Sequence, residues 1–67
     1  MEQLAEARQM AIDLGGSITD NDVGFITCFR NSVTAGRYME RVNDDFEEIT
    51  AEQQDRCVVV VTIASLM

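Results

Sequence analysis

Apolar residues recur at helical spacing near the start of the chain. Between residues 2 and 14 they are Leu4, Ala7, Ala11 and Leu14, with mostly polar residues at the other positions. Gly15 and Gly16 follow directly, and glycine often ends a helix because it adopts the left-handed conformation without steric cost. This pattern predicts a helix over residues 2–14 that stops at the glycine pair.

The next segment, SITDNDVGFITCFRNSV (residues 17–33), fits a second helix. Thr19 is a suitable N-cap, and Asp20 and Asp22 would then lie in the first turn, where the helix dipole favours negative charge. On a helix, one face would collect Phe25, Ile26, Phe29 and Val33. The composition of VGFITCF is also typical of a strand. The cap and the single apolar stripe favour the helix.

Residues 37–67 contain neither glycine nor proline, and their apolar positions repeat at spacings of three and four. A heptad repeat of this kind predicts one long helix whose apolar seam pairs with another copy of the chain. We expect this seam to be the oligomer interface. Its apolar residues are Met39, Val42, Phe46, Ile49, Val60, Ile63 and Met67.

Two features compete with one long helix. Thr50 and Gln53 fit a capping box, which would break the helix near Thr50. The run VVVVTI consists of β-branched residues, which favour a strand. A strand over residues 57–63 would need VGFITCF as its partner, and such a lone βαβ unit is too small a sheet to be stable. We therefore expect an all-α fold, a small helical bundle of two short helices and a long C-terminal helix, with α+β as the alternative.

The tail CVVVVTIASLM has no polar side when it is placed on a helix. An element that is apolar all round has to be buried all round. A single domain of 67 residues buries only about 60% of the surface of its unfolded chain, so it has little material to cover such a tail. The composition therefore predicts a homo-oligomer, most simply a dimer.

The formal net charge of −7 limits the function. It disfavours direct binding to nucleic acid and to anionic membranes, and the apolar tail is too short to span a bilayer. The chain has no histidine, so we expect neither a metal site nor a cofactor nor an enzyme. No signal-peptide pattern begins the chain, which predicts a cytoplasmic protein in which Cys28 and Cys57 are buried free thiols.

Carboxylates concentrate in the third segment. The predicted acidic face consists of Glu40, Asp44, Glu47, Glu48, Glu52 and Asp55. We expect it to dock on and block a basic protein, such as one that binds nucleic acid. The composition is similar to that of small acidic inhibitor proteins of phages and plasmids, without a shared motif.

Two alternative functions remain open from the sequence. The protein could be a structural or assembly subunit that acts only by self-association. It could also bind a small anion such as a nucleotide through the candidate cluster Arg30, Arg37 and Arg41, since guanidinium groups make bidentate contacts with such ligands.

Overall fold

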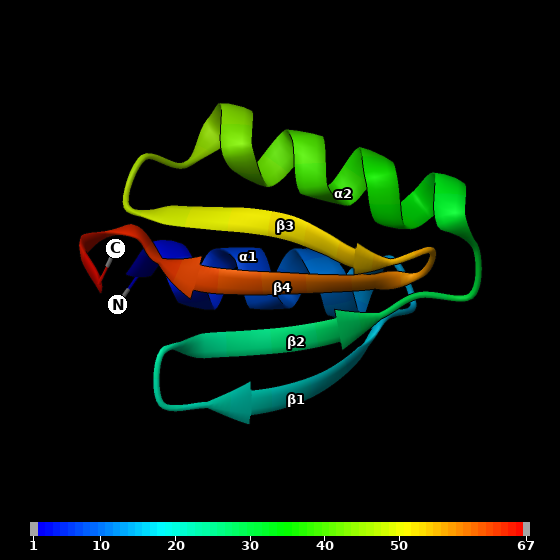
Figure 1. Ribbon diagram of the computed structural model, residues 1–67, viewed down its shortest axis with the longest axis horizontal. Helices are drawn as coiled ribbons and strands as arrows, with labels where there is room; N and C mark the ends of the chain where they lie inside the picture. The colour runs from blue at the N-terminus through cyan, green and yellow to red at the C-terminus, as the bar shows by residue number, and fades with distance from the viewer. Residues whose placement is uncertain (1, 67) are drawn as a thin grey trace.

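The computed structural model describes residues 2–66 of the chain and the side chains of residues 2–65. In chain order its elements are α1 (Glu2–Asp13), β1 (Ser17–Asn21), β2 (Gly24–Cys28), α2 (Ser32–Asp45), β3 (Ile49–Asp55), β4 (Val58–Ile63) and the 3-10 helix η1 (Ala64–Leu66). The protein is therefore an α+β domain (Figure 1).

The four strands form one antiparallel sheet in the order β1-β2-β4-β3. The hairpins β1–β2 and β3–β4 meet in the middle of the sheet, where β2 pairs with β4. Both helices pack on the same face, α1 against β1 and β2, and α2 mainly against β3 (Figure 1). In the described part of the chain, no helix covers the opposite face.

The fold consists of two similar αββ units. In each unit three residues join the helix to the first strand, and two residues join the strands. The helices also face the sheet with residues at the same spacings: Leu4, Ala7 and Ala11 in α1, and Ala35, Tyr38 and Val42 in α2. Exchanging the units maps the strand order onto itself, so an approximate two-fold axis passes between β2 and β4.

The predicted all-α bundle is wrong, and the alternative with a C-terminal strand is correct. Residues 17–28, expected to be helical, form the hairpin β1–β2, and Thr19 is a strand residue rather than an N-cap. The predicted long helix over residues 37–67 ends at Asp45, and the rest of that segment forms β3, β4 and η1. The expected break near Thr50 is not a new helix, because Thr50 lies within β3.

The α+β fold is stable because its sheet has four strands rather than two. β2 and β4 alone would make a two-stranded antiparallel sheet, which is too small to be stable. The polar strands β1 and β3 add one neighbour on each side of this pair. β4 is thereby hydrogen-bonded on both sides, which accounts for its β-branched composition.

Gly24 shows why the hairpin β1–β2 packs closely against β4. A Cβ atom on this residue would collide with the backbone oxygen of Val61, so only glycine fits. Before it, the Asn21 side chain accepts a hydrogen bond from the backbone N–H of Val23 at 2.9 Å. This Asx turn reverses the chain within the two residues between the strands.

The predicted end of the first helix at the glycine pair is confirmed. Gly15 has a φ of 86°, which is the left-handed conformation that glycine tolerates. Its N–H donates to the carbonyl of Ile12, and the N–H of Gly16 donates to that of Ala11. These two bonds form a Schellman motif, which satisfies carbonyls that the helix end would otherwise leave free.

The core lies between the helices and one face of the sheet. Its largest fully buried side chains are Tyr38, Phe25, Ile49, Val42, Val59, Val61 and Thr27. The Tyr38 hydroxyl donates to the backbone oxygen of Ala7 at 2.6 Å and so joins the two helices, while burial raises the pKa of Tyr38. Two residues of the tail, Val59 and Val61, are thus buried within a single chain.

The outer edge of β3 is capped by a side chain of α2. Asn43 donates from Nδ2 to the backbone oxygen of Ala51 at 2.9 Å, and its Oδ1 accepts from the N–H of Ala51 at 2.8 Å. An unpaired strand edge is a template for pairing with other chains. The Asn43 contact occupies this template at Ala51, so self-association by β3 edge pairing is disfavoured.

Candidate functional site

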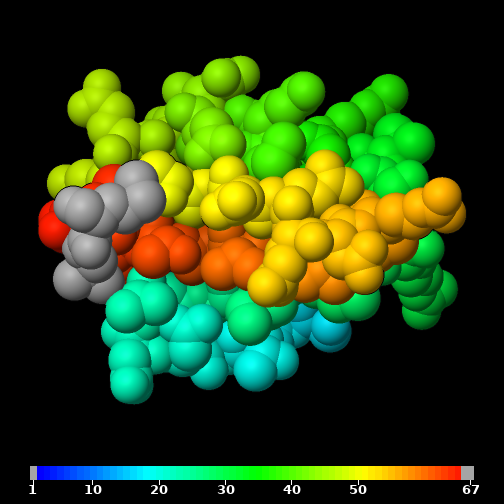
Figure 2. Space-filling model, in the orientation of Figure 1, coloured from blue at the N-terminus to red at the C-terminus, as the bar shows by residue number. Residues whose placement is uncertain are grey.

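Among the described residues no helix covers the sheet face opposite α1 and α2, and we call it the open face. Side chains of a strand alternate between faces, so the residues between the buried ones point here. Ile26, Val58 and Val60 lie on it and are half-buried. Figure 2 shows this side of the molecule, where β4 reaches the surface between β3 and β2.

The register places these apolar residues in the middle of the sheet. Ile26 lies opposite Val60, and Val60 lies opposite Glu52 on the edge strand β3. In the next row on this face, Cys28 lies opposite Val58. The face therefore has an apolar centre on β2 and β4, with polar residues on the two edge strands.

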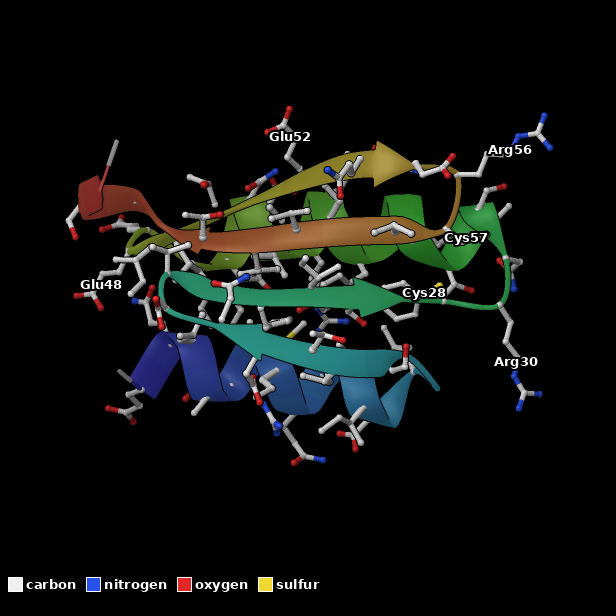
Figure 3. The ribbon with its side chains drawn as sticks, turned by 60° about the horizontal axis from the view of Figure 1, so that its bottom comes forward. Cys28, Arg30, Glu48, Glu52, Arg56 and Cys57 are labelled. Carbon is white, nitrogen blue, oxygen red and sulfur yellow. The ribbon has the colours of Figure 1, made fainter. Side chains whose placement is uncertain are left out.

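Charged residues lie at the rim of the open face. Arg30 and Arg56 lie at one end of the sheet, together with Cys28 and Cys57 (Figure 3). Glu48 lies at the other end (Figure 3). We call the end with Arg30 and Arg56 the basic end, although Asp55 adjoins Arg56 there, and the end with Glu48 the acidic end.

The residues of the predicted oligomer seam do not form one surface. Val42 and Ile49 are buried in the core of the single chain. Met39 and Phe46 pack partly buried against that core. Val60 is half-buried on the open face of the single chain. Ile63 is half-buried in β4, and Met67 lies outside the described residues.

The predicted acidic residues are spread over α2, β3 and the loop between them rather than over one helix face. Glu40 and Asp44 lie on α2, Glu47 and Glu48 follow that helix, and Glu52 and Asp55 lie on β3. All six are exposed. Docking of these residues on a basic protein stays a prediction.

The three arginines of the candidate anion site separate into two places. Arg37 and Arg41 of α2 line a cleft of about 330 Å³ between the two helices, whereas Arg30 lies at the end of the sheet. The other residues that line the cleft are Met10, Asp13, Leu14 and Tyr38. The sequence grouped these two arginines with Arg30 and did not indicate the residues that α1 contributes.

Both cysteines are free thiols, but the prediction that they are buried is wrong. Cys28 is exposed, and Cys57 is half-buried. Cys28 ends β2 on the open face, and Cys57 lies in the turn between β3 and β4. Their thiols are therefore open to solvent to different extents.

Among the described residues, no group of three or more acidic or cysteine side chains is placed to hold a metal ion. None of the described helices is both long and apolar enough to cross a membrane. Comparison with protein-family models, curated proteins and solved structures finds no match. The function therefore has to be argued from the surfaces of this chain.

Proposed function

We propose that the protein is a non-enzymatic assembly subunit that self-associates in the cytoplasm through its open face. The observation that carries this proposal is the row Ile26–Val60, an apolar centre that no described helix covers. A second copy is the partner that this surface fits best, because two such faces can pack as a sandwich with their strands within about 30° of each other.

The size of the open face is sufficient for a reversible dimer. Four strands at about 4.8 Å separation, each about six residues long, cover roughly 19 by 20 Å. The relief of the side chains makes the accessible area larger than this flat area. Stable interfaces bury about 800 Å² per partner, and transient ones about 600 Å² or less. We therefore expect a dimer that dissociates on dilution.

The charges at the rim favour one orientation of the two copies. If the two-fold axis runs across the strands, the basic end with Arg30 and Arg56 faces the acidic end with Glu48 of the partner copy. If the axis runs along the strands, like charges meet instead. Complementary charges select orientation and raise the association rate more than they raise affinity. The first arrangement is the one we propose.

Sedimentation velocity tests the proposal directly. The parent protein should change from monomer to dimer between about 1 µM and 1 mM. Val60→Lys should stay monomeric yet folded, because Glu52 lies opposite this position and opposite charges stabilise a cross-strand pair by about 0.2–1 kcal/mol. Val33→Lys is the matched control, since Val33 is 61% exposed on α2, away from the sheet face.

Several outcomes decide between the alternatives. Dimerisation that Val60→Lys abolishes and Val33→Lys preserves supports the open-face dimer. A parent that stays monomeric throughout the concentration range overturns it, as does a Val60→Lys variant that still dimerises. For the orientation, Arg56→Glu should weaken the dimer, and adding Glu48→Arg to this variant should restore it. If the second substitution does not restore the dimer, the arrangement with the two-fold axis across the strands is excluded.

A further inference from the structure

The cleft between the helices lies on the other side of the sheet from the proposed dimer face, and its walls carry opposite charges. Arg37 and Arg41 project from α2 on one wall. On the other wall Asp13 ends α1, where the helix dipole is negative and favours a cation. Met10, Leu14 and Tyr38 form the rest of the lining.

The charges across the cleft are not paired with each other. In the described part of the chain, no salt bridge joins Asp13 to either arginine. Asp13 accepts one hydrogen bond, from Gln9 to its Oδ1 at 2.9 Å, which leaves its second carboxylate oxygen open. The opposed charges are thus separated by space that a ligand can occupy.

The guanidinium groups also keep free donors. Arg41 uses only its Nε, which lies 3.3 Å from Oδ2 of Asp45, so its two terminal nitrogens remain. Arg37 makes no hydrogen bond to any described residue, and its fork of five N–H donors is uncommitted. Two adjacent arginines at i,i+4 repel each other on a helix, and an anion between them removes this repulsion.

The side chains of Met10, Leu14 and Tyr38 leave no free hydroxyl for a ligand in the cleft. The Tyr38 hydroxyl is committed to the Ala7 carbonyl, so only its ring contributes to the cleft. Leu14 is 52% exposed, so part of its side chain is open to a ligand in the cleft. A volume of about 330 Å³ is at the small end of ligand sites, which span about 300–1,000 Å³.

We propose that this cleft binds an α-amino acid with an apolar side chain. The carboxylate of the ligand accepts hydrogen bonds from Arg37 and Arg41, and its ammonium group donates to the open oxygen of Asp13. The side chain lies on Met10 and Leu14. Charge balance favours a zwitterion, because the two arginines together with Asp13 and Asp45 sum to zero.

Titration of the ¹⁵N-labelled full chain, followed by two-dimensional NMR, tests this site. L-phenylalanine should shift the amide signals of residues around the cleft in a saturable manner. Two analogues separate the contributions of its charged groups. 3-Phenylpropionate lacks the ammonium group, and 2-phenylethylamine lacks the carboxylate, so both should bind more weakly than the amino acid.

Substitutions then assign each contact. Arg37→Gln should weaken L-phenylalanine binding about tenfold, which corresponds to a charge-assisted hydrogen bond. Arg30→Gln is the matched control and should bind as the parent does, because Arg30 lies outside the cleft. Asp13→Asn should weaken binding of the amino acid but strengthen binding of 3-phenylpropionate. General damage to the fold would not produce such opposite changes.

Three results would overturn the inference. The first is saturation by inorganic phosphate at the same signals with no response to L-phenylalanine, which would indicate a simple anion site. The second is equal binding by Arg37→Gln and the parent. The third is the absence of any shift of the amide signals up to about 10 mM L-phenylalanine, since a weak site with a dissociation constant of about 1 mM would be largely occupied at that concentration. Because the cleft and the open face are separate, Val60→Lys should leave this binding unchanged.

Discussion

The alternation of β4 makes a specific prediction about two neighbouring valines. Val61 is fully buried beneath the helices, whereas Val60 points to the open face. Val61→Ala removes the equivalent of two methylene groups, a loss of about 1.6 kcal/mol in transfer free energy, and the cavity that remains adds to it. We expect a total destabilisation of about 2–3 kcal/mol.

Val60→Ala should cost much less in the monomer, about 0.5 kcal/mol, because solvent already reaches this side chain. A domain of this size has a total stability of roughly 3–10 kcal/mol, so the difference between the two variants is a large fraction of it. For such a domain 1 kcal/mol shifts the melting temperature by about 4–8 °C. Val61→Ala should therefore melt about 8–24 °C below the parent.

Urea denaturation followed by circular dichroism measures both variants. The experiment should be run near 1 µM protein, where the proposed dimer is dissociated, so that only the monomer core is compared. Equal losses for Val60→Ala and Val61→Ala would refute the reasoning, because the two residues would then occupy equivalent environments. A larger loss for Val60→Ala would place the core on the opposite face of the sheet.

Three further predictions concern single features of the fold. Gly24→Ala should destabilise the fold by about 2–4 kcal/mol, measured in thermal melts, because the added Cβ would collide with β4. In Gly36→Ala the added Cβ would have no atom within 3.4 Å, so this variant should instead stabilise α2 by about 0.5–1 kcal/mol. A Gly24→Ala variant as stable as the parent would contradict the close packing. Asn43→Ala should lower the free energy of unfolding by about 1–2 kcal/mol and speed hydrogen exchange at the Ala51 amide of β3, which Asn43 caps. Unchanged exchange at this amide would show that the cap does not protect the edge. The hydrogen bond from Arg8 lowers the pKa of Asp20, so this pair stabilises the fold above the ordinary aspartate pKa of 3.8 and ceases to do so as the pH falls through the lowered value. Acid titrations should show a difference in stability between the parent and Arg8→Gln at neutral pH that disappears once the pH falls below the lowered pKa of Asp20, and a constant difference would exclude the ion pair as its cause.

The first helix could be predicted because its signals are local. Its apolar spacing and the glycine pair that ends it lie within one short segment, and the Schellman motif at Gly15 needs no tertiary contact. The second helix was predicted at the wrong position because a local capping signal occurs twice. Its real N-cap is Asn31, whose side chain accepts from the N–H of Thr34, and Thr19 has the same capping chemistry.

The sheet could not be predicted because half of it does not resemble a sheet. β1 (SITDN) and β3 (ITAEQQD) are polar edge strands, and nothing in their composition distinguishes them from loops. Without them, the β-prone segments β2 and β4 lack sufficient partners. The apparent heptad from Met39 to Ile49 also crosses from α2 into β3, so its spacing was coincidental.

The candidate sites were predicted only as far as they depend on one element. The pairing of Arg37 with Arg41 follows from helical spacing, whereas their approach to Asp13 depends on how α1 and α2 pack on the sheet. The apolar tail did indicate an uncovered surface, but only one side of it is uncovered. Continuous β-branched runs hide the period of two that separates the buried Val59 from the open Val60.

The two αββ units explain why both proposed surfaces exist. Each unit brings one helix, of 12 or 14 residues, and both helices lie on the same face because the approximate two-fold axis is perpendicular to the sheet. That symmetry leaves the second face without a helix in the part of the chain that the structure describes. It also brings the helices together side by side, where the C-terminal end of α1 meets the middle of α2 and forms the charged cleft. A chain built in this way buries one side of its central strands by itself, and another copy of the same sheet is the simplest cover for the other side.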